Sequence, residues 1–171
     1  MKVYNGRRVF TRDNTTRGEA SVFVQNVLSH EPDGRGLTNE PNLGEPGALM
    51  HIPFHSPDGF EWGYAGSGPA DLALAILADY FEEPPEQVLG ALRSLWAPRS
   101  KAVALHQEFK EQFIARERRN EWRLGSDVIE AWLQTPSIQT QLIELDRQDE
   151  ELAEIRRLDE EAGSADAESA D

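Results

Sequence analysis

The clearest alternation of hydrophobic and polar positions lies in the middle of the chain. Phe60, Trp62 and Tyr64 occupy every second position, with Glu61 and Gly63 between them. Aromatic residues at a period of two are typical of a strand that has one apolar face. The segment therefore predicts a buried central strand.

A glycine turn and an apolar run follow this predicted strand. Gly66 and Gly68 break the alternation, and every residue of the range 72–78 is apolar. Pro69 suits the first position of a helix, because its missing N–H would have no partner there. Asp71 suits the first turn, where a carboxylate meets the positive end of the helix dipole. A helix that is apolar nearly all round belongs at the centre of a core.

Hydrophobic patterns elsewhere predict a hairpin, further strands and four more helices. Asn5-Gly6 lies between β-prone residues, which is typical of a two-residue turn, so residues 2–10 are expected to form a small hairpin. Residues 20–24 have strand composition, and Trp122–Leu124 either adds a short strand or plugs the core. The helices are predicted from Pro85 to about Trp96, from Ser100 to Arg116, from Ser126 to Leu133 and from Pro136 onward.

Together these elements predict the α+β class. We expect a small antiparallel sheet, made of the hairpin and the central aromatic strand, packed by four to five helices. Residues 1–134 are predicted to form one compact domain, within which residues 29–50 are a long loop or insert, either a lid over the glycine turn or a dispensable addition. Residues 135–162 predict an acidic C-terminal helix, and residues 163–171 a disordered tail.

The negative charge of the chain is concentrated near its C-terminal end. Of the formal net charge of -14, the segment Glu144–Asp171 carries -9, from twelve acids and three arginines. A surface this acidic argues against direct binding to nucleic acid, which needs a positive face, and suits a basic protein partner. The same charge could serve solubility alone.

Composition also bears on chemistry and location. The chain has no cysteine, so it has no disulfide and no thiolate metal site. No apolar run approaches the length needed to span a membrane, and the N-terminal residues lack the pattern of a signal peptide. We therefore expect a cytoplasmic protein without membrane contact.

The glycine turn is the candidate binding site. A helix that starts behind such a turn presents free N–H groups to an anion, although the glycines could equally serve to relieve crowding. Pro69 follows Gly68 where a phosphate-binding P-loop needs Lys, so that motif is excluded. The residues predicted to bind a small ligand are Tyr64, Gly66, Ser67, Gly68, Asp71, His55 and Glu61.

Metal binding and catalysis have weaker support. His51 and His55 lie four residues apart, but Pro53 between them disfavours a helix, and a third ligand such as Asp58 is not evident. Ser67, His55 and Asp71 are the residue types of a catalytic triad, and nothing in the sequence places them in contact. We therefore predict no metal, no cofactor and no catalytic residue.

The run SPDGFEWGYAGSGPADLA, residues 56–73, resembles the signature of an uncharacterised family of small proteins from bacterial, archaeal, phage and plasmid genomes. Val3–Arg8 is similar to the family's Tyr-x-Gly strand, and His106–Lys110 with Trp122–Leu124 to its helix and closing Trp segment. The likeness covers most of residues 1–134 and implies no activity. This chain departs from the family in the insert at 29–50 and in its acidic extension.

Two functions fit these observations. The first is a non-enzymatic interaction or accessory protein of mobile-element type, with a basic protein partner bound through the acidic extension. The alternative is a small-ligand or phosphate-binding domain, or an enzyme, that uses Gly66–Gly68. A loose apolar stripe from Ile138 to Leu158 packs on the core or allows a homodimer.

Overall fold

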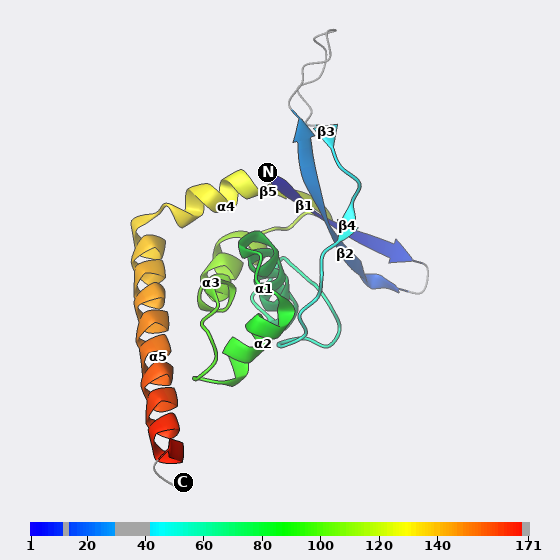
Figure 1. Cartoon of the computed structure of the whole chain (residues 1–171). Coiled ribbons are helices and arrows are strands. Elements are labelled where there is room, and N and C mark those ends of the chain that lie inside the picture. The colour runs from blue at the N-terminus through cyan, green and yellow to red at the C-terminus, as the bar shows by residue number, and fades with distance from the viewer. Residues whose placement is uncertain (12–13, 30–41, 169–171) are drawn as a thin grey trace.

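The computed structural model describes residues 1–11, 14–29 and 42–168 (Figure 1). Its strands are β1 (Lys2–Thr11), β2 (Asn14–Ser29), β3 (Asn42–Leu43), β4 (Gly47–Ala48) and β5 (Glu121–Gly125). Its helices are α1 (Ser67–Phe81), α2 (Pro85–Arg93), α3 (Lys101–Phe109), the π-helical segment η1 (Lys110–Ile114), α4 (Ser126–Leu133) and α5 (Pro136–Glu168). An antiparallel sheet and several helices confirm the α+β class.

The sheet is antiparallel, with the strand order β3-β2-β1-β5, and β4 also pairs with β2. The hairpin predicted at Asn5-Gly6 is wrong, because β1 runs straight through both residues and pairs with β2 along nearly its whole length. Gly6 stands opposite Trp122 of β5, and a Cβ there would lie 2.1 Å from the indole Cε2 atom. The glycine thus makes room for a tryptophan rather than a turn.

The predicted central strand is also wrong. Residues 60–66, all of which the structure describes, contain no strand, and β5 takes the place beside β1. Trp62 is buried while Tyr64 is 42% exposed, so the segment does not present one continuous apolar face. Part of the loop predicted over residues 29–50 instead joins the sheet as β3 and β4, and residues 30–41 lie outside the described part of the chain.

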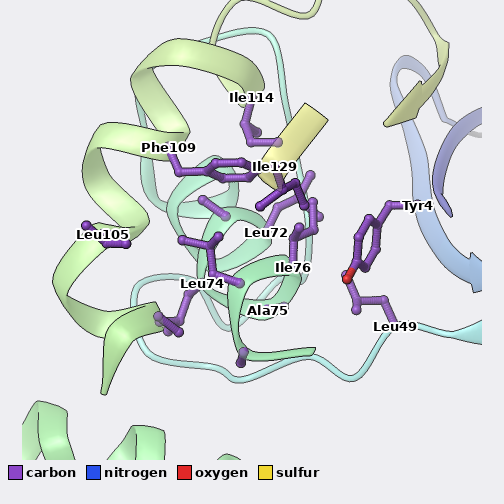
Figure 2. Close-up of a cluster of buried hydrophobic side chains, with 14 of the residues drawn as sticks. Tyr4, Leu49, Leu72, Leu74, Ala75, Ile76, Leu105, Phe109, Ile114 and Ile129 are labelled. Carbon is purple, nitrogen blue, oxygen red and sulfur yellow. The ribbon is translucent and has the colours of Figure 1, made fainter. Parts of the chain in front are cut away.

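Helix α1 is the centre of the core, as predicted (Figure 2). Every residue from Gly68 to Ala78 is buried, and its alternating Ala and Leu side chains favour a helix that packs closely on all sides. Leu72, Leu74 and Ile76 meet Leu105 and Phe109 of α3 in one cluster. The helix starts at Ser67 behind Gly66, two residues before the predicted first position at Pro69, so Asp71 lies beyond its first turn.

Helix α5 is the longest element and forms an outer column beside α3 (Figure 1). Ile138 and Leu152 are buried, so part of its apolar stripe packs on the chain's own core. The helix continues to Glu168 and includes residues 163–168, where the sequence predicts a tail, while residues 169–171 lie outside the described part. Among the described helices, none has the length and apolar character that a membrane span requires.

Candidate functional site

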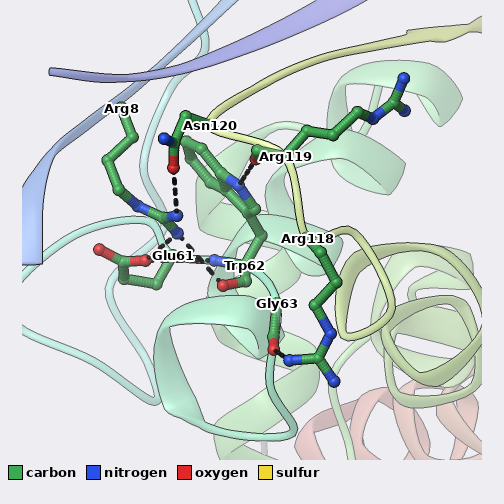
Figure 3. A network of polar contacts seen from close by, with 7 residues as sticks. All are labelled: Arg8, Glu61, Trp62, Gly63, Arg118, Arg119 and Asn120. Carbon is green, nitrogen blue, oxygen red and sulfur yellow. Dashed lines mark hydrogen bonds and ion pairs between the residues drawn. The ribbon is translucent and has the colours of Figure 1, made fainter.

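The segment Phe60–Tyr64 is fastened to the domain by side chains instead of a strand ladder (Figure 3). Arg8 of β1 donates to the Glu61 carboxylate at 2.7 Å and to the Trp62 carbonyl at 3.2 Å. Its guanidinium also lies 4.3 Å from the centre of the Trp62 ring, which is a cation–π contact. The Trp62 indole N–H donates to the Arg119 carbonyl at 2.8 Å. This network fixes the residues that enter the glycine turn.

Each of the three glycines of the turn meets a close neighbour. Gly63 has a φ of +88°, in the left-handed region, and a Cβ there would lie 2.9 Å from the Glu117 carbonyl oxygen. A Cβ on Gly66 would lie 2.3 Å from the Tyr64 ring, and one on Gly68 would lie 2.8 Å from the Cβ of Glu61. The turn therefore needs glycine to let its own side chains pack over the start of α1.

Asp71 is the polar centre of this region and is fully buried. Its carboxylate accepts hydrogen bonds from the backbone N–H groups of His55 at 2.8 Å, Ser56 at 2.9 Å and Phe54 at 3.3 Å. The His51 Nε2 atom lies 3.2 Å from the same carboxylate. A buried carboxylate surrounded by donors organises the loop before the aromatic segment onto α1.

A pair of histidines extends this polar region toward α3. The Nε2 atoms of His55 and His106 lie 3.1 Å apart, and the amide nitrogen of Gln107 lies 2.8 Å from the same His106 atom. His106 Nδ1 lies 2.7 Å from the Val103 carbonyl, which fixes the proton on Nδ1 and leaves Nε2 as an acceptor. Burial lowers the pKa of His106, and the nearby His55 lowers it further, while the bond to Val103 opposes this shift.

The structure places the predicted site residues in different environments. Asp71 and His55 come together, but Asp71 accepts from the His55 backbone while the His55 ring turns to His106. Ser67 is exposed at the start of α1, and no hydrogen bond found among the described residues joins it to His55. Within the described residues, no group of three or more His, Cys, Asp or Glu has the arrangement of a metal site.

A cavity of about 390 Å³ lies beside the turn and contains several predicted ligand residues in its walls. Tyr64, Glu61 and Gly68 line it on one side, and Glu19 lines it from β2. Asp58 adds a third carboxylate, and no Lys or Arg is found among the described lining residues. Carboxylates repel a phosphate, so the chemistry of these walls suits a cationic or neutral ligand better.

The charged surface of α5 is a second feature of note. Arg147 pairs with Glu144 and Glu151, and its hydrogen bond to Glu144 lowers the pKa of that carboxyl to about 2. Arg157 pairs with Glu154 in the same way. Acids still outnumber arginines along this helix, so the ion pairs leave α5 with a strong negative charge.

Three contributors to these sites were not identified from the sequence. The sequence pattern gives Arg8 no role in a site and leaves Trp122 open between a short strand and the core. His106 is buried, and its ring also contacts His55 and Gln107. Arg8 bonds Glu61, 53 residues away, His106 contacts His55, 51 residues away, and Trp122 packs on Gly6 of β1, so the local sequence carries no signal of these contacts.

Comparison with known proteins identifies a family. The model of a family described as a "family of unknown function", DUF6166, matches residues 4–135. No curated protein and no solved structure matches the chain. The matched span holds the sheet, the aromatic segment, the glycine turn and helices α1 to α4, whereas α5 begins at residue 136.

Proposed function

We propose that this chain, which belongs to the family of unknown function DUF6166, is a non-enzymatic interaction protein that binds a basic protein partner through α5. The observation that carries the proposal is the acidic surface of α5, which extends as a column outside the matched span (Figure 1). Regular rows of carboxylates on a rigid helix attract and orient a positively charged partner at long range.

The contacts of the glycine turn support a role in the fold rather than in chemistry. The Asp71 carboxylate is surrounded by backbone donors, and Glu61 is paired with Arg8. Neither carboxylate is free to act as a base or nucleophile without breaking a buried contact. This distribution of contacts favours a protein that acts by presenting a surface.

The resemblance to proteins of phages and plasmids suggests the setting of this interaction. An accessory protein of a mobile element can act on its host by occupying a basic host surface that otherwise meets nucleic acid. The negative charge of α5 is compatible with such mimicry, because phosphate backbones and carboxylate rows attract the same lysines and arginines.

The test is a pull-down from host-cell lysate with the full chain as bait. An acid-neutralised variant carries Glu151→Gln, Glu154→Gln and Asp159→Asn, and its matched control carries Glu45→Gln, Glu86→Gln and Glu130→Gln. All six side chains are exposed, so both variants should fold normally. A partner captured by wild type and control but lost from the acid-neutralised variant supports the proposal, and equal capture by all three baits refutes it.

A second candidate function is binding of a small ligand in the cavity beside Tyr64, which its volume of about 390 Å³ favours. A thermal-shift screen with polyamines, cationic amino acids, sugars and nucleotides tests it, because a ligand that binds only the folded state raises the melting temperature. Asp58 is exposed at the edge of the cavity, and Asp58→Asn should weaken the binding of any cationic ligand. The absence of any stabilising compound would count against this function.

A further inference from the structure

A group of large apolar side chains is exposed where α5 passes the segment between α2 and α3. Leu95 is 80% exposed and Trp96 66%, whereas the other three tryptophans of the chain are at most 7% exposed. Ile155 and Leu158 of α5 are 43% and 52% exposed. Soluble proteins rarely leave such residues together in water unless they serve an interface.

Leu95, Trp96, Leu152 and Ile155 line one cavity of about 270 Å³, which we name the Trp96 groove. One wall is the 94–99 segment and the other is α5, so the groove follows the helix axis. Leu152 and Ile155 of this wall are three residues apart, and Leu158 repeats the spacing beyond the groove on the same helix. That spacing suits a helix laid alongside, whose own apolar side chains would enter between them.

The walls of the groove are fastened to each other. The backbone N–H of Arg99 donates to the Asp149 carboxylate at 2.8 Å, and the Arg156 guanidinium donates to the Trp96 carbonyl. These two contacts join the 94–99 segment to α5 at both ends of the groove. A preformed groove loses little conformational freedom when a partner binds, which favours affinity.

The charges around the groove select its occupant. Glu151 lines it, and Asp159 lies two helical turns further along the same side of α5 as Glu151 and Ile155. Arg99 also lines the groove, and the Arg156 guanidinium lies against the Trp96 carbonyl, but acids far outnumber arginines along α5, so this face keeps a net negative charge. A second copy of this chain would bring another strongly acidic α5 to the same surface, and like charges would oppose that association.

We propose that the Trp96 groove binds an amphipathic basic helix of a partner protein. The apolar side chains of that helix contact Leu95, Trp96 and Ile155, and its lysines or arginines meet Glu151 and Asp159. The inference rests on the proposed function, since it names the surface and the chemistry through which the interaction would occur. Aromatic side chains such as Trp96 commonly dominate binding at interfaces of this kind.

The exposure of Trp96 provides a direct measurement. Because Trp62, Trp122 and Trp132 are buried, acrylamide should quench mainly the fluorescence of Trp96 in the full chain. The probe is a labelled peptide of about 18 residues, or about 27 Å as a helix, with leucines at helical spacing, lysines elsewhere and no aromatic residue. We expect it to bind in an anisotropy titration and to lower acrylamide quenching toward that of Trp96→Phe.

Three comparisons make the test specific. Ile155→Asp places a charge in the groove at an exposed position and should weaken binding about tenfold or more without unfolding the chain. Ile143→Asp is its matched control, because Ile143 is 68% exposed on the same helix but does not line the groove. A peptide with the same composition but alternating Leu and Lys forms no apolar helical face and should bind weakly.

The outcomes distinguish binding in the groove from binding to the charge of α5 alone. One outcome would overturn the groove as the binding site and leave the proposed function standing. In it, the acid-neutralised variant loses peptide binding, Ile155→Asp keeps it, and acrylamide still quenches Trp96. Binding lost in Ile155→Asp and retained in Ile143→Asp supports the groove. Absence of peptide binding to the wild-type chain overturns the inference. It is also overturned if Trp96 is protected from acrylamide without peptide, at protein concentrations where light scattering shows dimers.

Discussion

Asp71→Asn is the substitution that most directly tests how the glycine turn is held. The change keeps the size of the side chain but replaces one carboxylate oxygen with an NH₂ group. In the folded protein, one oxygen accepts from His55 and the other from Ser56 and Phe54. Whichever way the new amide turns, its NH₂ group faces a backbone N–H in a site that water does not reach.

The magnitude follows from this geometry. A buried donor without an acceptor costs about 1–3 kcal/mol, and the remaining bonds lose the roughly 1 kcal/mol that a charged acceptor adds to each. The free energy of unfolding should therefore fall by about 3–5 kcal/mol. For a chain of 171 residues this lowers the melting temperature by roughly 6–20 °C. Since a typical domain is stable by about 5–15 kcal/mol, the loss is a large fraction of the total.

Urea unfolding followed by tryptophan fluorescence measures the effect, because Trp62 and Trp132 are buried reporters. Asp79→Asn is the matched control on the same helix. The Asp79 side chain is 29% exposed and bonds Tyr4 and Lys2, so its loss should cost about 1 kcal/mol. If Asp71→Asn lost no more stability than Asp79→Asn, the account of Asp71 as the organising carboxylate would be refuted.

Three further predictions concern the core and its histidines. Gly6→Ala should destabilise the chain by about 1–3 kcal/mol, because the new Cβ would collide with Trp122. Gly90→Ala, within α2, should stabilise it by about 0.5–1 kcal/mol, because that Cβ would lie an ordinary 3.6 Å from Ala97, and urea unfolding compares the two variants. Tyr4→Phe should cost about 1 kcal/mol, because the Tyr4 hydroxyl donates to Asp79 at 2.8 Å; a loss above 3 kcal/mol would contradict this contact as the cause. The pKa of His106 is lowered in the folded state, so the unfolded chain binds the proton first as the pH falls through about 6.5, and the free energy of unfolding should decrease over that range. Urea unfolding curves between pH 7.5 and 5 should show a shallower decrease for His106→Gln than for wild type, and an unchanged slope would count against the His106 contribution.

The sequence predicted the elements whose packing follows from their own periodicity. The apolar run from residue 72 to 78 identified α1 as the central helix, and the start of α5 at Pro136 was also correct. Local patterns were sufficient there because a helix forms its backbone bonds within itself. The ends of the helices differ from the prediction by a few residues, as for α1, which begins at Ser67 and not at Pro69.

The errors arose where distant residues decide the outcome. Asn5-Gly6 has the composition of a turn, but the reason for the glycine is the indole of Trp122, more than a hundred residues away. The alternation from Phe60 to Tyr64 suggested a strand, but Arg8, Ile114 and Arg119 take up the backbone and side-chain contacts of the segment. Such partners become neighbours only in the folded chain.

The candidate sites show the same division. The cavity beside Tyr64 and Glu61 contains residues that the sequence selected, and their ligand-binding role stays a prediction. The sequence does not predict the Trp96 groove, because its pattern places Leu95 and Trp96 at the end of the helix expected from Pro85 to about Trp96. In the structure, α2 ends at Arg93, so both side chains fall in the following segment and point away from the core.

The pairing of β1 with β5 determines when this protein can fold during its synthesis. Lys2 bonds Ser126, and Val3 to Arg7 pair with Gly125 to Glu121, so the first strand waits for a partner made more than a hundred residues later. At about 5–20 residues per second on the ribosome, that delay lasts roughly 6–24 s. Throughout this interval, one edge of β1 is open to other chains. We expect chains arrested before residue 120 to be cut readily by protease, and chains that expose residues 1–135 to resist it.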